Sequence, residues 1–161
     1  MTTRRRFVSY GAALAGAALV GAGPLAFAVA GEFPFALTDE EWRARLTQDQ
    51  YDILRRHGTE YAFSSPLDKL YEPGTYHCAG CDHPLYGSDA KYDSRTGWPS
   101  FWESLSGAIG TSVDVSLLMV RTECHCANCG GHLGHIFDDG PEPTGKRHCI
   151  NGVALAFRPA A

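Results

Sequence analysis

The chain has 161 residues, with a hydrophobic content of 44% and a charged content of 20%, which suits one globular domain and argues against disorder. Its formal net charge is −4 at pH 7, and because the first thirty residues hold three arginines and no acid, the remainder carries −7. An acidic body of this kind argues against binding of nucleic acid or another polyanion as the main role.

The N-terminal segment differs in composition from the rest of the chain. Three arginines precede a run rich in glycine and alanine, which is the order found in export signals, and Thr3–Val8 resembles the twin-arginine motif. We expect an export signal over residues 1–30, cleaved after Ala28 or Ala30. The mature domain, residues 31–161, would then lie in the periplasm or cell envelope without membrane association. An uncleaved signal would instead be a membrane anchor, because about 20 apolar residues span a bilayer.

Two short helices are expected at the start of this domain. Thr38 with Glu41, and Thr47 with Gln50, both fit the capping box, in which a hydroxyl reaches forward and a Glu or Gln side chain reaches back. Gly58 is expected to end the second helix in the left-handed conformation.

Short β-rich runs replace the helical pattern further along the chain. From residue 72 onward, glycine and proline recur between such runs, which are TYHC (75–78), PLYG (84–87), SVDVSLLMVRTE (112–123) and GVALAF (152–157). We predict a mainly β fold of antiparallel strands that follows the two small helices.

Four of the six cysteines form two C-x-x-C pairs, Cys78 with Cys81 and Cys126 with Cys129, which are separated by 44 residues. Four thiolates suit a tetrahedral zinc ion or, less often, iron, and they leave no open position for catalysis. The pattern predicts a structural metal that joins two distant hairpins. Two disulfides or a redox C-x-x-C motif are the alternatives.

Cys149 has no second cysteine nearby. A short strand over 146–151 would place Arg147, Cys149 and Asn151 on one face. The arginine would lower the pKa of the thiol and favour a reactive thiolate. The alternative interpretation is a buried structural cysteine.

Two histidines and an aromatic cluster accompany this cysteine. His132 and His135 are three residues apart, so in an extended strand only one of them would face Cys149. The segment 98–102, WPSFW, would form either part of the core or an apolar wall for a small methyl-bearing ligand.

These motifs together resemble the methionine-R-sulfoxide reductases, the MsrB family. The resemblance extends from about Phe35 to Arg158 and is carried by EPGTYHCAGCDHPLY, GWPSFW, CANCGGHLGHIFDDGP and RHCING. It implies a zinc-bearing, mainly β fold of two antiparallel sheets with small N-terminal helices. It also implies an oxidoreductase that reduces methionine-R-sulfoxide in oxidised proteins or peptides.

The resemblance assigns roles to individual residues. Cys149 matches the nucleophile that becomes a sulfenic acid, and His135 matches the proton donor, with His132 beside it. Asn151 would hold the substrate or a water. Arg147 would favour the thiolate. The expected substrate-binding aromatics are Trp98, which would receive the sulfoxide methyl, Phe101 and Phe137, and the expected zinc ligands are Cys78, Cys81, Cys126 and Cys129.

One position departs from the family pattern. Many members have a resolving cysteine directly before GWPSF, where this chain has Thr96. Cys124 is the only spare thiol that could resolve Cys149; the rival is direct reduction by an external, thioredoxin-like thiol protein. A different class of function, a zinc-ribbon-like module that binds a partner without chemistry, is the alternative for the whole chain.

Overall fold

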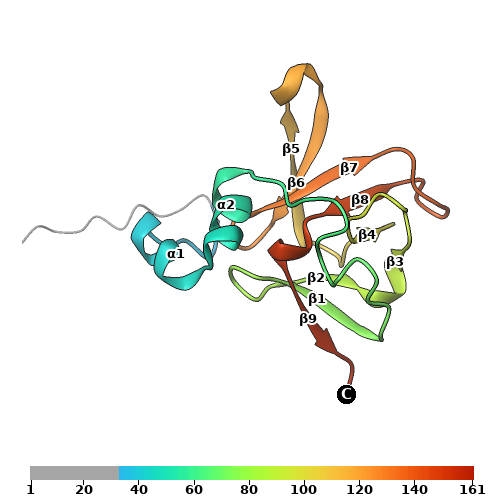
Figure 1. The fold of residues 1–161 in the computed structure, drawn as a ribbon, viewed down its shortest axis with the longest axis horizontal. Helices are drawn as coiled ribbons and strands as arrows, with labels where there is room; N and C mark the ends of the chain where they lie inside the picture. Colours follow the sequence, from blue (N-terminus) through green and yellow to red (C-terminus); the bar gives the residue numbers. More distant parts are fainter. Residues whose placement is uncertain (1–32) are drawn as a thin grey trace, which may run out of the picture.

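The computed structural model describes residues 33–161, so the expected export signal lies outside the described residues. Within this range, none of the helices is both long and apolar enough to cross a membrane. Two helices, α1 (Asp39–Arg45) and α2 (Gln48–Arg56), precede nine strands and three short 3-10 turns. The prediction of a mainly β fold with small N-terminal helices is confirmed (Figure 1).

Both helices begin with the capping boxes that the sequence predicts. Thr38 caps α1 together with Glu41, and Thr47 caps α2 together with Gln50. The expected left-handed glycine at the end of α2 is wrong, because His57 takes this conformation, with φ of 56°. Gly58 serves another purpose: a Cβ there would lie 2.8 Å from the carbonyl oxygen of Asp52.

The strands form two antiparallel sheets. The smaller has the order β2-β1-β9, and the larger has the order β3-β4-β8-β7-β6-β5. The bounds are β1 Gly74–Cys78, β2 Pro84–Gly87, β3 Lys91–Tyr92, β4 Ser100–Phe101, β5 Ile109–Asp114, β6 Arg121–Cys126, β7 His132–Phe137, β8 Arg147–Ile150 and β9 Leu155–Pro159. The 3-10 turns are η1 Ser88–Ala90, η2 Ser116–Leu118 and η3 Gly152–Ala154.

The apolar core lies between the two sheets and extends beneath the helices. Tyr86 from β2 stacks on Phe101 from β4, with ring centroids 4.3 Å apart, and both side chains are fully buried. Trp42 and Leu54 bring the helices into the same core. Burial of such large side chains contributes about 1.5–3 kcal/mol each, so this contact helps to hold the two sheets together.

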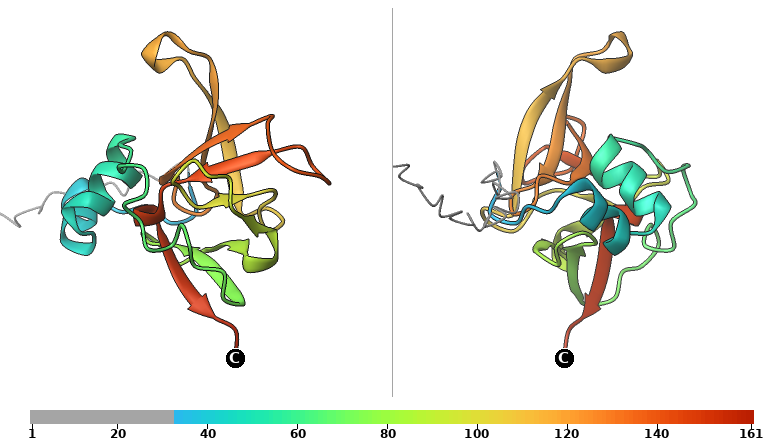
Figure 2. Two further views of the ribbon diagram at one scale, coloured as in Figure 1. Left: turned by 45° about the vertical axis from the view of Figure 1, so that its right-hand side comes forward. Right: turned by 90° about the vertical axis from the view of Figure 1, so that its left-hand side faces the viewer.

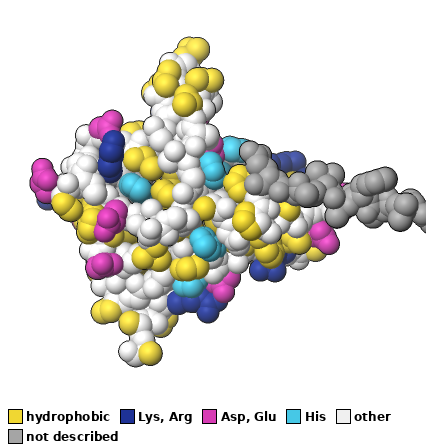
Figure 3. Space-filling model, turned by 180° about the vertical axis from the view of Figure 1, so that it is seen from behind, with side chains coloured by type: hydrophobic (Ala, Val, Ile, Leu, Met, Phe, Trp, Pro, Cys, Tyr) yellow, Lys and Arg dark blue, Asp and Glu magenta, His cyan; other side chains and the backbone are white. Residues whose placement is uncertain are grey.

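The run from 112 to 123 is a hairpin rather than one strand. β5 and β6 pair in register from Ile109↔Cys126 to Asp114↔Arg121, and η2 forms the turn between them. The hairpin stands out from the body in both views of Figure 2. Hydrophobic side chains gather at its end (Figure 3) and are exposed there: Val113, Val115, Leu118, Met119 and Val120.

Candidate active site

The four paired cysteines come together at the junction of the two sheets. Their sulfur atoms all lie within 4.8 Å of one another, with Cys78 Sγ 3.7 Å from Cys129 Sγ and Cys81 Sγ 3.6 Å from Cys126 Sγ. A tetrahedral zinc ion with Zn–S bonds of about 2.3 Å separates its sulfurs by about 3.8 Å, so the set fits such an ion. A disulfide requires about 2.05 Å, so the disulfide alternative does not fit.

The helices hold this cysteine cluster in place. Arg45 at the end of α1 donates from Nε to the carbonyl oxygen of Gly80, between the first two cysteines, at 2.6 Å. Arg55 in α2 donates from Nη1 to the carbonyl oxygen of Cys129 at 3.0 Å. Two guanidinium groups near four thiolates offset the negative charge that a zinc ion with four thiolate ligands would keep. The cluster therefore joins β1, β6 and both helices.

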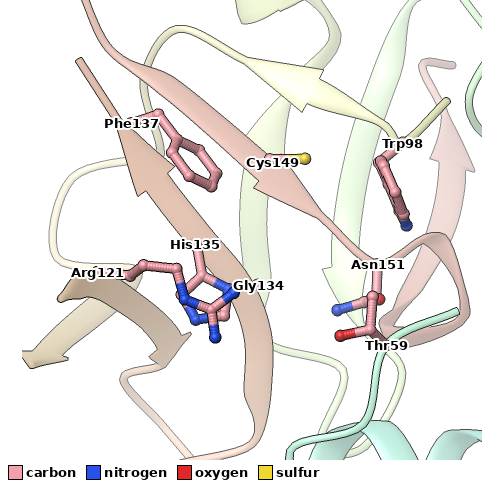
Figure 4. Close-up of a pocket in the computed structure, with 8 residues that line it drawn as sticks. All are labelled: Thr59, Trp98, Arg121, Gly134, His135, Phe137, Cys149 and Asn151. Carbon is pink, nitrogen blue, oxygen red and sulfur yellow. The ribbon is translucent and has the colours of Figure 1, made fainter. Parts of the chain in front are cut away.

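A pocket of about 150 Å³ opens beside Cys149 on the other part of the large sheet. Figure 4 shows the Cys149 sulfur pointing from β8 toward the ring of Trp98, with Phe137 and His135 on the other side. The lining residues are Thr59, Trp98, Arg121, Gly134, His135, Phe137, Cys149 and Asn151. This volume admits a single side chain rather than a large cofactor.

Burial and the charge of Arg147 shift the pKa of the Cys149 thiol in opposite directions. Burial raises the pKa of this thiol, and Arg147 and a weak contact from Thr96 oppose the rise without cancelling it. Arg147 is held by a double hydrogen bond to Asp139, at 2.8 and 2.9 Å, and its guanidinium lies over the ring of Phe137. The guanidinium thus favours the thiolate, as the sequence predicts, but burial outweighs it and keeps the pKa of the thiol above its ordinary value.

His135 lies directly opposite Cys149 in the pairing of β7 with β8. Its Nε2 donates to Asp114 Oδ2 at 2.8 Å, and the same oxygen accepts a bond from Arg121 at 2.6 Å. The pKa of Asp114 is lowered by hydrogen bonds from Ser116, then by those from His135 and Arg121. Asp114 is therefore ionised and can only accept, so Nε2 of His135 carries the proton of this hydrogen bond.

An extended strand would turn His132 and His135 to opposite faces, so that only one of them faces Cys149. In the structure the two rings lie side by side, yet still only one of them lines the pocket. Their rings meet edge to face, with centroids 5.4 Å apart. The pairing of β6 with β7 shifts register, so that Cys124 pairs with Gly134 and His125 with His132, which leaves one extra residue in β7. Because of this extra residue, two side chains three positions apart in β7 lie on the same face of the sheet. Of the two, only His135 lines the pocket; His132 lies behind it and donates to Glu123 at 2.6 Å.

Trp98 and Asn151 form the opposite wall of the pocket, and both are tied to Glu60. Trp98 Nε1 donates to the backbone carbonyl of Glu60 at 3.2 Å. Asn151 lies just beyond β8, where its Oδ1 accepts from the backbone N–H of Glu60 at 3.0 Å and its Nδ2 donates to Leu133 at 2.9 Å. One Nδ2 hydrogen remains for a ligand or a water in the pocket.

Two of the three aromatic residues that were expected to bind the substrate lie at the pocket. Trp98 and Phe137 line the pocket, but Phe101 does not, because its side chain points into the core against Tyr86 and Tyr76. Three lining residues, Thr59, Arg121 and Gly134, were not predicted from the sequence. Gly134 is required by close approach, since a Cβ there would lie 2.1 Å from the Cys149 carbonyl oxygen.

The geometry does not support Cys124 as the resolving thiol. Cys124 pairs with Gly134 in β7, which pairs with Ile150 in β8. Two strand spacings place the Cα atoms of Cys124 and Cys149 about 9–10 Å apart, beyond the roughly 7 Å limit for a disulfide. Cys124 also faces the core, fully buried against Tyr86, and burial raises the pKa of its thiol to about 12.

Thr96 lies beside Cys149, in a position from which a resolving cysteine could react with the Cys149 sulfur. Its hydroxyl oxygen is 4.0 Å from the Cys149 sulfur. It also shares a hydrogen bond with Ser94 at 2.8 Å, and Ser94 in turn bonds to Ser100 at 2.7 Å. A chain of hydroxyl groups therefore occupies the space beside the thiol, and no described thiol adjoins Cys149 there.

The sequence of the chain is similar to that of known enzymes. Residues 46–159 match the family described as the SelR domain. The peptide methionine sulfoxide reductase MsrB of Agrobacterium fabrum is 54% identical over 123 residues, covering 76% of this chain and 91% of that protein. The MsrB protein of Thiobacillus denitrificans is 51% identical, with 76% and 93% covered. The chloroplastic reductase B1 of Oryza sativa subsp. japonica is 52% identical, with 76% of this chain and 58% of the plant protein covered. The chain therefore belongs to the SelR-domain (MsrB) family of peptide methionine sulfoxide reductases.

Proposed function

We propose that this chain reduces the R epimer of methionine sulfoxide in proteins and peptides, with Cys149 as nucleophile. The observation that carries the proposal is the pocket itself, which brings an otherwise unpaired cysteine together with His135 and Trp98. A module that only binds a partner has no need of this combination. The small, open pocket suits one methionine sulfoxide side chain of a polypeptide, whose backbone remains outside.

The chemistry begins with loss of the Cys149 proton, because the thiolate and not the thiol is nucleophilic. The sulfur attacks the sulfoxide sulfur, and the oxygen is transferred to the cysteine. Thiolate, sulfoxide and one proton thus give a sulfenic acid on Cys149 and a methionine thioether. The sulfoxide is reduced by two electrons, which Cys149 supplies.

The sulfoxide oxygen becomes a good acceptor as the sulfur is attacked, so a proton donor lowers the barrier. His135 is the candidate, because it lines the pocket opposite Cys149 and its other nitrogen is bonded to Asp114. The hydrogen bond to the Asp114 carboxylate fixes the orientation of the imidazole ring beside the pocket. Asn151 positions the substrate or a water with its remaining N–H, and the Trp98 ring accommodates the methyl group.

Recycling then uses an external dithiol. The first thiol attacks the sulfenic acid, releases water and forms a mixed disulfide, and the second thiol frees Cys149 as an oxidised disulfide leaves. The burial of Cys124 on the core face supports this route over an internal disulfide. A thioredoxin-like protein supplies such a dithiol.

The four-cysteine cluster holds one structural zinc ion in this proposal. With four protein thiolates it leaves no position for substrate, so its contribution is to folding. The arginine-led N-terminal segment supports export to the periplasm or envelope, where the reductase would repair oxidised surface and envelope proteins. Fractionation of cells, with and without replacement of the arginine pair, tests the location separately.

The function is tested with a peptide that carries methionine sulfoxide of defined configuration. With dithiothreitol as reductant, the purified chain should convert the R epimer and leave the S epimer intact. Cys149→Ser should be inactive, with unchanged zinc content and circular dichroism, because an alkoxide is not available at neutral pH. Turnover of both epimers, or activity in the serine variant, would contradict the proposal.

A further inference from the structure

A second set of metal-type donors lies outside both the cysteine cluster and the catalytic pocket. His57, Glu123 and His132 each offer one ligand atom, and these atoms all lie within 4.8 Å of one another. Nδ1 of His57 is 2.9 Å, and Nδ1 of His132 is 2.6 Å, from the same carboxylate oxygen of Glu123. The three residues come from the end of α2, from β6 and from β7, so tertiary structure brings them together.

The donors are those of a divalent transition metal. Two imidazole nitrogens and one carboxylate oxygen bind zinc and its neighbours, and a three-ligand set leaves positions open to water. Neighbouring ligands at about 2.0–2.1 Å from such an ion stand about 2.9–3.4 Å apart. The distances from Glu123 to the two histidine nitrogens, 2.9 and 2.6 Å, are close to this spacing. A movement of the imidazoles would admit an ion in place of the Nδ1 protons, with the imidazoles in the Nε2–H form.

The surroundings of these donors favour a cation. Glu123 is oriented from outside by Ser112, whose hydroxyl donates to its second oxygen at 2.6 Å. Burial alone would raise the pKa of Glu123, but hydrogen bonds from Ser112 and His132 hold it lower, so the carboxylate is ionised. The negative end of the α2 dipole also points toward His57.

The site has an entry path. His132 is 2% exposed and Glu123 is 12% exposed, whereas the side chain of His57 is 63% exposed. The three residues line a cleft that adjoins the catalytic pocket and shares Thr59, Arg121 and His135 with it. An ion can enter from solvent over His57 without passing Cys149.

We propose that His57, Glu123 and His132 form a second, separate binding site for a divalent transition-metal ion of the zinc and nickel class. We further infer that the bound ion inhibits the reductase reversibly, because it occupies the cleft beside the catalytic pocket and engages the histidine that packs on His135. The inhibitory part rests on the proposed function, whereas the binding part does not.

Equilibrium dialysis of the full chain against zinc, followed by metal analysis, tests binding. Wild type should retain one more ion than His57→Asn, in which asparagine tolerates the left-handed backbone but lacks the imidazole. His83→Asn, which removes a histidine outside the site, should match wild type, as should Cys149→Ser. Glu123→Gln, which keeps a hydrogen-bond acceptor for the histidines, should lose the extra ion.

Equal zinc content in wild type and His57→Asn would overturn the site, and loss of the extra ion in Cys149→Ser would assign it to the catalytic thiol instead. Both results are independent of activity. In the reductase assay, added zinc should inhibit wild type and His83→Asn at least tenfold more strongly than His57→Asn, whose basal rate should be unchanged. Equal inhibition of all three would overturn the inhibitory part alone.

Discussion

His135 donates a hydrogen bond from Nε2 to Oδ2 of Asp114 over 2.8 Å. Asp114 ends β5 in the projecting hairpin, whereas His135 lies within β7, opposite Cys149. The hairpin thus provides the carboxylate that orients the candidate proton donor. Arg121, at the start of β6, donates to the same oxygen and keeps the carboxylate in position.

Replacing Asp114 with Asn should therefore lower kcat by about tenfold to a hundredfold, with a smaller change in KM. This is less than the roughly hundredfold to ten-thousandfold contribution of a general acid, because His135 itself remains. The amide can donate as well as accept, so it no longer fixes the orientation and tautomer of the His135 ring as a carboxylate does. Steady-state kinetics over a range of pH provide the measurement. Asp138→Asn, which removes an exposed carboxylate bonded to Lys146, is the matched control. An unchanged kcat in Asp114→Asn at every pH would remove Asp114 from the mechanism.

The short distance between Thr96 and Cys149 predicts that a cysteine introduced at position 96 can form a disulfide with Cys149. Thr96→Cys places a thiol where a hydroxyl oxygen now lies 4.0 Å from the Cys149 sulfur. After one turnover without reductant, this variant should form an internal disulfide, seen as the loss of both free thiols by mass spectrometry. Thr96→Ser should retain the sulfenic acid, as wild type does. Absence of the disulfide in Thr96→Cys would show that the two side chains cannot meet.

Arg147 and Asp139 should change the reactivity of Cys149 in opposite directions. Arg147 lowers the pKa of this thiol and Asp139 raises it, against the larger upward effect of burial. A higher pKa leaves less thiolate at neutral pH, so Arg147→Met should slow alkylation by iodoacetamide, and Asp139→Asn should speed it. In each variant, the pH at which the rate reaches half its maximum should move with the pKa. A shift of the same sign in both variants would contradict this electrostatic account.

The cysteine cluster should dominate stability. Cys129→Ser removes one of four ligands and should release the metal, at a cost of about 5 kcal/mol or more. For a domain of this size that loss lowers Tm by about 10–20 °C. Calorimetry and zinc analysis of the same sample give both quantities. Cys124→Ser, which alters a buried thiol outside the cluster, should keep its zinc; loss of zinc there as well would mean that the assay reports general unfolding.

Features encoded over a few residues could be predicted from the sequence. The capping boxes at Thr38 and Thr47 depend on residues three positions apart, and the C-x-x-C pairs depend on tight turns, so both appear in the structure as expected. The roles of Cys149 and His135 followed from family motifs, and the structure brings both residues to one pocket.

Features that depend on pairing between distant strands could not be predicted in this way. β3 and β4 have two residues each and exist because of their neighbours. The bulge in β7 has no signature in the sequence, so the packing of His132 against His135 could not be predicted from it. Asp114 lies 21 positions before His135, and only the hairpin geometry reveals their contact. Phe101 was wrongly assigned to the substrate pocket, because the sequence of a short strand does not show whether an aromatic side chain packs in the core or lines a binding site.

The most direct test of the account is the state of Cys149 after one turnover. The chain, reduced and freed of reductant, is mixed with an excess of peptide that carries methionine-R-sulfoxide, then treated with dimedone and analysed by mass spectrometry. About one methionine should form per chain, together with one dimedone adduct on Cys149, and Cys124 should remain a free thiol. Methionine formed without modification of Cys149, or a disulfide between Cys149 and Cys124, would contradict it.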